Sequence, residues 1–208
     1  VVWSDKKTIE KHIAMTHRWA KRAFDHFKPK YDDVRGVLFP IVQWGTYLDL
    51  RTQSAEYLSQ FAWDGIAIWW VSVWESKELI QQVVAHTTPL LPNDKPRYLM
   101  GVWTPEDLLY GIEQGIDMFD CVTPTRLWRH WIAFSDHWNI KITNSWYRTD
   151  FSPLTDNCDC FTCRNFSKAY LCHLIREQET LWWALVWLHN IVYLNRILED
   201  WKRKFMED

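Results

Sequence analysis

Three cysteines and a later histidine form the most specific chemical pattern in the chain. Cys158, Cys160 and Cys163 follow a C-x-C-x-x-C spacing, and His189 lies further along. Three thiolates and one imidazole fill the tetrahedral coordination of Zn²⁺, so a closed set of four protein ligands predicts a structural zinc site. Three cysteines within six positions suit a metal better than a disulfide framework in a reduced compartment.

Two neighbouring residues are rival ligands for the same metal, Cys172 and His173. We favour Cys172 as a small buried hydrophobe instead. The alternative without a metal is a loop with free thiols and a histidine on a helix surface.

A carboxylate, Asp120, directly follows Met118 and Phe119. At the end of a strand in an α/β barrel, a carboxylate could act as a nucleophile, a base or a ligand. A helix-capping or ion-paired aspartate is the structural alternative.

Polar side chains near other strand ends suit a nucleotide. Gln43 follows "FPIV", and an amide that both donates and accepts suits the edge of a nucleobase. Arg126 and Arg129 are expected in a loop beyond Asp120, where paired guanidinium groups suit phosphate. A hydrogen-bonded glutamine and a solvated loop are the structural alternatives.

Composition limits the partners. The chain has 208 residues and a net charge of −2, so it has no general attraction for nucleic acid or membranes, and any RNA contact must be local. It has no signal-peptide core and no apolar run of about 20 residues, which predicts a cytoplasmic protein without membrane contact. Because the sequence does not begin with Met, we expect a fragment.

Apolar runs alternate with helical patterns, which predicts the α/β class with a parallel sheet. The expected strands are residues 36–43, 63–69, 97–102 and 116–122, and the expected helices are 6–27, 46–61, 75–87 and 105–115. Four such strand–helix units are half of a (β/α)₈ TIM barrel. Beyond residue 122 we expect a hairpin at 132–143, the cysteine cluster, and two long helices from about residue 165.

Several motifs together resemble those of the tRNA-guanine transglycosylases, also called queuine tRNA-ribosyltransferases. They are "IVQWG", "DLRTQSAE", "DGIAIWWVSVWESKE", "KPRYLMGVWTPED", "GIDMFDCVTPTR", "CDCFTC" and "LHN". The resemblance covers nearly the whole chain. It implies the C-terminal half of a TIM barrel over residues 1–145, and a zinc-binding subdomain with C-terminal helices over residues 146–208.

The resemblance also implies an activity in queuosine biosynthesis. A family member is a pentosyltransferase that exchanges guanine at the tRNA wobble position for a 7-deazaguanine, preQ1 or queuine. By similarity, Asp120 is the nucleophile and forms a covalent bond to the ribose. The implied partners are the tRNA anticodon loop, the 7-deazaguanine base and, in the full-length form, a second copy in a homodimer.

The resemblance assigns roles to further residues. Six of them contact or support the base: Gln43, Trp70, Val71, Glu75, Tyr98 and Met100. Arg126 and Arg129 would hold anticodon-loop phosphates. The zinc ligands would be Cys158, Cys160, Cys163 and His189.

The resemblance covers only the C-terminal half of a family member. The family's second aspartate, a proton shuttle, belongs to the N-terminal half, so we expect this chain alone to be inactive. The alternative function is a non-catalytic, zinc-containing partner subunit that binds tRNA.

Tryptophan occupies many positions where the family has glycine, and the chain has 16 Trp but only 6 Gly. These positions are Trp44, Trp69, Trp70, Trp74, Trp103 and Trp128, with Trp131, Trp138 and Trp182 as further candidates. Several Gly→Trp changes would exceed the roughly 5–15 kcal/mol stability of a domain. We hypothesise that UGA codons, which encode glycine in some bacteria, have been read as tryptophan. Deliberate substitution is the rival explanation.

Overall fold

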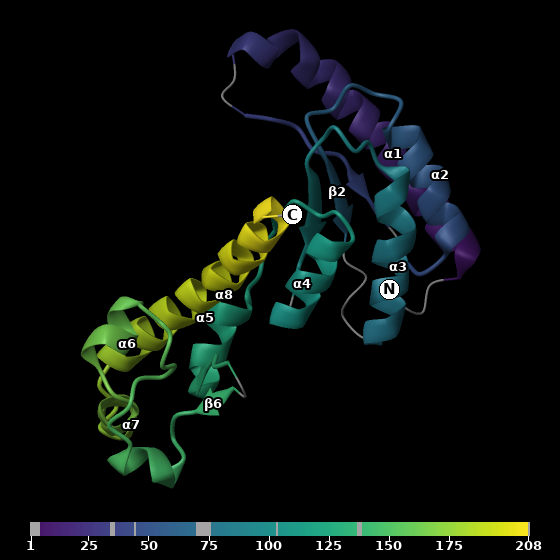
Figure 1. Cartoon of the computed structure of the whole chain (residues 1–208). Helices are drawn as coiled ribbons and strands as arrows, with labels where there is room; N and C mark the ends of the chain where they lie inside the picture. Colours follow the sequence, from purple (N-terminus) through teal and green to yellow (C-terminus); the bar gives the residue numbers. More distant parts are fainter. Residues whose placement is uncertain are drawn as a thin grey trace. The chain divides into compact units, whose positions relative to one another are not determined.

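The computed structural model describes residues 5–33, 36–43, 45–69, 76–102, 104–136 and 139–207. The chain divides into two compact units (Figure 1). The first unit comprises residues 1–102 and 106–121, and the second unit comprises residues 103–105 and 122–208.

The described part of the first unit forms a four-stranded parallel sheet in the order β1-β2-β3-β4. Its strands are β1 (Ile41–Val42), β2 (Ile66–Trp69), β3 (Arg97–Met100) and β4 (Met118–Phe119). Each strand pairs with the next one along the chain, and this order lacks the reversal of a doubly wound sheet. The predicted α/β class with a parallel sheet is confirmed.

One helix precedes β1, and each of the next three connects two successive strands of the sheet. They are α1 (Lys6–Phe27), α2 (Leu48–Leu58), α3 (Lys77–Thr87) and α4 (Pro105–Glu113). Helix α1 contacts α2, and α2 contacts α3 (Figure 1). Side-chain caps fix two of the starts: Asp5 accepts a hydrogen bond from the Thr8 N–H at 2.7 Å, and Ser76 accepts one from the Leu79 N–H at 3.4 Å.

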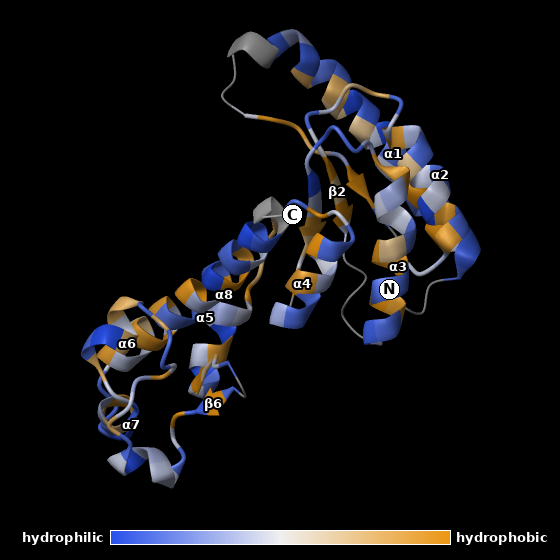
Figure 2. Ribbon diagram, in the orientation of Figure 1, coloured by the Kyte–Doolittle hydropathy of each residue, from blue (hydrophilic) through white to orange (hydrophobic). Residues whose placement is uncertain are grey.

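The sheet is the centre of the apolar core in the first unit. Figure 2 shows hydrophobic orange on the strands around β2 and mixed colours along α1 to α3. Val42, Ile68 and Leu99 are fully buried. Burying a side chain of this size stabilises the fold by roughly 1.5–3 kcal/mol, so these residues hold the strand ends in fixed positions.

The strands are shorter than the sequence predicted. The run from residue 36 enters the ladder only at Ile41, because Pro40 has no N–H to donate, although its carbonyl accepts from the Ala67 N–H at 2.9 Å. The run from residue 116 is a strand only at Met118 and Phe119.

The second unit combines helices with a two-stranded antiparallel sheet. Its elements are α5 (Thr123–Leu127), β5 (Ile132–Ala133), β6 (Ile140–Lys141), α6 (Phe161–Asn165), α7 (Lys168–Arg176) and α8 (Leu181–Glu207). A buried cluster that includes Ile142, Leu154, Leu171 and Val186 forms its core. The β5–β6 pair confirms the predicted hairpin.

Two expectations for the second unit are wrong. The segment with Arg126 and Arg129 is not a loop, because Arg126 lies in α5 and Arg129 in the 3₁₀ helix Trp128–His130. Pro124 in the first turn favours this helix, since its missing N–H is not needed there. Of the two long helices expected, α7 has only nine residues and ends before Gln178, whose φ is +58°.

Residues 122–145 have contacts that bear on the domain boundary. The hairpin residues Ala133, Ile140 and Ile142 are buried with residues of α7 and α8. The contacts therefore place these residues with the second unit, whereas the assignment of residues 1–145 to a catalytic barrel remains a prediction.

Trp131 has a backbone conformation that favours glycine. Its φ of 58° and ψ of 35° are left-handed, and among the described non-glycine residues only Gln178 shares a positive φ. This conformation costs an L-residue roughly 1–2 kcal/mol, so it supports glycine at this position. Trp128, in contrast, has a helical φ of −58°. The centroid of its ring is 5.8 Å from that of the Trp182 ring.

The other candidate glycine positions give no comparable backbone evidence for glycine. Trp69 ends β2 with half of its surface exposed. Trp44, Trp70, Trp74, Trp103 and Trp138 lie outside the described residues. The decoding hypothesis therefore remains a hypothesis, supported by Trp131.

Replacing Trp131 by glycine should stabilise the second unit. Relief of left-handed strain exceeds the extra backbone entropy of glycine, so we expect a gain of about 1 kcal/mol and a melting temperature about 4 °C higher. The control is Trp146→Gly, since Trp146 is 67% exposed and does not have a positive φ. Thermal unfolding followed by circular dichroism should show a gain for Trp131→Gly only; equal losses in both variants would contradict this account.

Candidate functional site

The carboxyl ends of the four strands in the parallel sheet bring two predicted site residues, Gln43 and Asp120, to one edge of the sheet. Gln43 directly follows β1, Trp69 ends β2, Gly101 follows β3 and Asp120 follows β4. In parallel α/β folds, ligands bind at this edge. The expected position of Asp120 at the end of the fourth strand is confirmed.

Two hydrogen bonds fix the carboxylate of Asp120. Its Oδ1 accepts from the Tyr98 hydroxyl at 2.8 Å and from the Gly101 N–H at 2.9 Å. The backbone is also held, because the Val102 N–H donates to the Asp120 carbonyl at 3.0 Å. Asp120 is exposed, and its Oδ2 accepts no hydrogen bond from the described residues. One carboxylate oxygen is therefore anchored while the other remains available for a reacting atom.

Gly101 reaches Asp120 through an unusual backbone conformation. Its φ is +76°, which glycine adopts without strain and other residues rarely adopt. The turn after β3 thereby directs the Gly101 N–H at the carboxylate. We expected Asp120 from the sequence but missed this donor, although a glycine directly after an apolar strand is a signal for such a turn.

Tyr98, which the resemblance predicts as a contact of the base, is hydrogen-bonded to Asp120. Burial, followed by its hydrogen bond to Asp120 and the charge of that carboxylate, raises the pKa of Tyr98 to about 12. The phenol therefore stays protonated near neutral pH and keeps donating to Oδ1. Tyr98 and Met100 are two residues apart on β3, so their side chains leave the same face of the strand.

The Tyr98 pKa gives a titration that can be measured. The pKa of Tyr98 in the folded protein exceeds its ordinary value of 10.0. Its contribution to the free energy of unfolding is therefore fully present below about pH 10 and is lost as the pH rises through about 12. Ultraviolet titration should show a late-ionising tyrosine that is absent in Tyr98→Phe and whose pKa shifts downward in Asp120→Asn. Burial also raises the pKa of Tyr110, so that tyrosine should ionise late in all three proteins. An unchanged titration in Asp120→Asn would contradict the contact.

The other predicted substrate residues are placed only in part. Gln43 and Met100 are half-buried at the ends of their strands. Trp70, Val71 and Glu75 lie outside the described residues.

The two predicted RNA-binding arginines lie in the second unit, whereas Asp120 lies in the first. Arg126 and Arg129 are both exposed. The Arg129 guanidinium lies over the Trp128 ring, 5.8 Å from its centroid. An exposed guanidinium beside an indole is suited to a phosphate or a base.

The four predicted metal ligands meet in one buried cluster. The ligand atoms of Cys158, Cys160, Cys163 and His189 all lie within 4.8 Å of one another. His189 Nδ1 is 3.7 Å, 3.5 Å and 3.3 Å from the three sulfurs, in that order. Tetrahedral zinc with ordinary bond lengths places sulfur and nitrogen about 3.6 Å apart, so the residues fit this ion.

Hydrogen bonds outside the cluster orient its histidine. His189 Nε2 lies 2.9 Å from the Phe134 carbonyl, so it carries the proton and leaves Nδ1 free to coordinate. The next residue, Asn190, accepts the Phe134 N–H at 2.9 Å. Both polar groups of the Phe134 backbone are therefore held by α8, and neither Phe134 nor Asn190 was predicted.

The electrostatics of the cluster favour a cation. Hydrogen bonding from the Cys163 thiol lowers the pKa of Cys160 to about 3, against the opposing effect of burial. The same hydrogen bond and burial raise the pKa of Cys163. Burial acts to lower the pKa of His189, but hydrogen bonds with Cys158 and Cys160 raise it to about 9. The Cys160 sulfur therefore favours the thiolate form, and His189 favours the protonated form. A metal ion that binds the cluster would replace this proton.

The rival ligands do not join the cluster. Cys172 is 1% exposed in the apolar core of the second unit, as expected of a small hydrophobe. His173 is exposed on α7. The described metal-ligating group contains only the four predicted residues.

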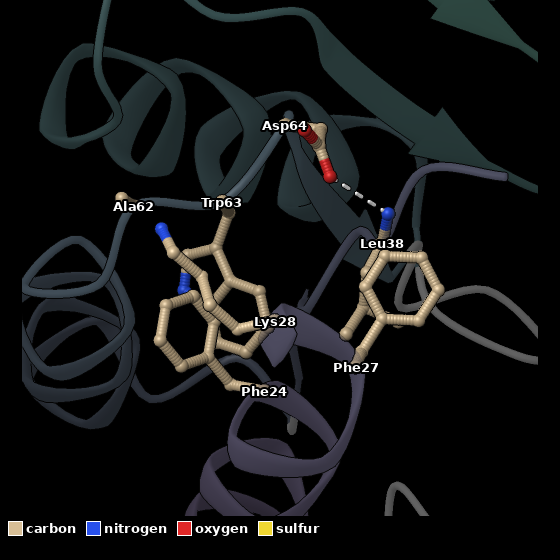
Figure 3. A pocket seen from close by; sticks show the side chains of 7 residues that line it. All are labelled: Phe24, Phe27, Lys28, Leu38, Ala62, Trp63 and Asp64. Carbon is tan, nitrogen blue, oxygen red and sulfur yellow. Dashed lines mark hydrogen bonds between the residues drawn. The ribbon is translucent and has the colours of Figure 1, made fainter. Parts of the chain in front are cut away.

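A small apolar hollow lies elsewhere in the first unit. It is bordered by Phe24, Phe27 and Lys28 from the end of α1 and the start of the next turn, and by Leu38, Ala62, Trp63 and Asp64 (Figure 3). Its volume is about 10 Å³, which is room for about one water molecule. Asp64 precedes β2 and accepts the Leu38 N–H at 2.9 Å, so the hollow lies at the amino ends of the strands, away from Asp120.

In the part of the chain that the structure describes, no helix has the length and apolar character needed to cross a membrane.

Comparisons with known proteins show which family the chain resembles. The family model described as queuine tRNA-ribosyltransferase matches residues 2–208. The queuine tRNA-ribosyltransferase of Dictyoglomus turgidum is 42% identical over 205 residues, 99% of this chain and 52% of that protein. The queuine tRNA-ribosyltransferase of Vibrio cholerae is 47% identical over 199 residues, which are 96% of this chain and 52% of that protein. That of Caldanaerobacter subterraneus is 42% identical over 205 residues, which are 99% of this chain and 54% of that protein.

The chain spans about half the length of these curated relatives. The family match, in contrast, covers almost all of the chain, including both strand-end and cysteine motifs. The chain therefore belongs to the queuine tRNA-ribosyltransferase family.

Proposed function

We propose that the full-length protein is a tRNA-guanine transglycosylase, which exchanges guanine at the wobble position of tRNA for a 7-deazaguanine. The observation that carries the proposal is Asp120. In a chain of this family, an exposed carboxylate at the catalytic edge of the sheet is anchored by Tyr98 and Gly101 through one oxygen only.

In the proposed reaction Asp120 acts twice on the same carbon. Its Oδ2 attacks C1′ of the ribose, the bond from C1′ to guanine breaks, and guanine leaves with the bonding electrons and takes up a proton. The incoming base then gives up a proton, bonds to C1′ and releases the Asp120 carboxylate. A carboxylate suits this exchange because it stabilises positive charge on C1′ before it bonds to it.

The remaining predicted residues would bind the two substrates. We propose Gln43, Trp70, Val71, Glu75, Tyr98 and Met100 for the base, and Arg126 and Arg129 for phosphates of the anticodon loop. The half-buried positions of Gln43 and Met100 at strand ends support their part in this proposal. Either preQ1 or queuine would meet the same set of residues.

The metal in this proposal is Zn²⁺, held by Cys158, Cys160, Cys163 and His189. Four protein ligands leave no open position, so the ion would stabilise the fold and take no part in the exchange. We further propose that residues 1–145 are half of a TIM barrel, that residues 146–208 are a zinc-binding subdomain, and that the full-length protein is a cytoplasmic homodimer.

The decoding hypothesis belongs to this proposal, because a pocket for a base needs room beside Trp69 and Trp70. Nucleotide sequencing of the gene decides it. UGA codons at residues 69, 70 and 131 would support glycine in the natural protein, and UGG codons there would refute the hypothesis.

Exchange of labelled guanine into tRNA tests the proposed activity. The full-length protein, as translated in its own host, should incorporate radiolabelled guanine into a tRNA with a guanine at the wobble position, and not into one with another base there. A protein that binds tRNA and zinc without incorporation would instead be the non-catalytic partner subunit.

A further inference from the structure

Arg51 is a completely buried cation beside the candidate site. It lies in the first turn of α2, and its side chain is 0% exposed. Its Nε donates to the Gly45 carbonyl at 3.1 Å, and its two Nη atoms donate to the carbonyls of Val42 at 3.4 Å and Trp69 at 3.3 Å. A buried guanidinium is costly unless its donors are used, so these contacts are a built feature of the fold.

The three acceptors are concentrated at the carboxyl ends of two adjacent strands. Val42 ends β1 and Trp69 ends β2, while Gly45 lies in the turn after β1 with a φ of +65°. Along the chain, Gln43 therefore lies between Val42 and Gly45, whose carbonyls both accept hydrogen bonds from Arg51. Residue 70 directly follows Trp69, the third acceptor. One rigid side chain links both backbone segments that the proposed base site uses.

We propose that Arg51 is a positioning residue for the base, an inference that rests on the proposed function. It fixes the turn carrying Gln43 against the end of β2, so that the amide of Gln43 and the carbonyl of Trp69 are held at one spacing. The planar guanidinium is suited to this task, because its donors point along fixed and divergent directions. Lysine, a single point of charge on a flexible stem, could not hold all three carbonyls in this geometry.

The same sheet supplies a matched control. Arg97 begins β3, and it also donates to three backbone carbonyls: Pro92 at 3.1 Å, Leu91 at 3.0 Å and Gly115 at 3.4 Å. These acceptors lie at the amino end of the strand, away from Asp120. Arg97→Lys therefore removes the same kind of bonds and tests the contribution to stability alone.

The experiment measures KM for the base, kcat at saturating base and thermal unfolding in full-length Arg51→Lys and Arg97→Lys proteins, with guanine as the probe. We expect Arg51→Lys to raise KM for guanine at least tenfold, with kcat within about threefold of the parent and the Kd for tRNA unchanged. Arg97→Lys should lower the melting temperature without changing KM. A parent protein that fails to exchange guanine would refute the proposed function, whereas an active parent makes the variants informative.

An unchanged KM in Arg51→Lys, or equal effects of both variants on KM, would overturn the inference. If Arg51→Lys does not fold, Arg51→Gln keeps a planar donor group of smaller reach and should show the same rise in KM. Failure of both Arg51 variants to fold, with Arg97→Lys folded, would make Arg51 a determinant of folding and would also overturn it.

Discussion

Replacement of Asp120 by asparagine should lower kcat for guanine exchange by about 10⁴-fold or more, as loss of a nucleophile does in other enzymes. Asparagine keeps the size of the side chain and an oxygen that can accept from Tyr98 and Gly101. It lacks the negative charge that attacks C1′. The loss should therefore appear in kcat, with little change in the Kd for tRNA, when exchange is measured with labelled guanine.

Asp117→Asn is the matched control for this prediction. Asp117 is exposed, lies three residues before Asp120, and accepts the Arg97 N–H at 2.8 Å at the other end of β4. Its replacement should leave kcat within about threefold of the parent. Comparable activity of the Asp120→Asn and Asp117→Asn proteins would remove Asp120 from the reaction.

Replacement of Cys158 by alanine should abolish the proposed binding of zinc and unfold the second unit. Structural zinc sites contribute apparent free energies of about 10–16 kcal/mol, which is as large as the total stability of a typical domain, about 5–15 kcal/mol. The effect should spread beyond the cluster, because His189 also donates to Phe134 in the hairpin segment. Atomic emission would measure zinc, and circular dichroism would measure helix content and unfolding.

Cys172→Ala separates loss of metal from loss of packing. Cys172 is buried like Cys158, with 1% and 7% of their surfaces exposed, but it lies outside the metal-ligating cluster. This variant should retain one zinc ion per chain and lose only about 1 kcal/mol of stability from a small cavity. Retention of full zinc content and native unfolding by Cys158→Ala would contradict the assignment of the ligands.

Local patterns could be predicted well from the sequence. Helix α1 has the predicted bounds. Its signals are local in the sequence, because the spacing of its apolar residues and the Asp5 cap both involve residues close together in the chain. The metal cluster was also predictable, since three of its four ligands are within one short segment. His189 was placed in the set by the resemblance and by its residue type, and the structure brings it to the sulfurs.

Contacts that depend on the pairing of distant strands could not be predicted. The bond between Tyr98 and Asp120 requires the register of β3 against β4, in which Tyr98 pairs with Met118. Strand ends depend on the same pairing, which explains why β1 and β4 are shorter than their apolar runs. Arg51 was missed because an arginine in a helix is usually exposed, and nothing in its neighbours marks it as buried.

Mass mapping of a trapped tRNA adduct tests the central claim most directly. The full-length protein would be incubated with tRNA without an incoming base, quenched in denaturant, digested with protease and nuclease, and sequenced by tandem mass spectrometry. The account predicts a ribose-linked nucleotide on the peptide containing Asp120, released when a 7-deazaguanine is added before the quench. An adduct on another residue, or none from a protein that exchanges guanine under the same conditions, would contradict it.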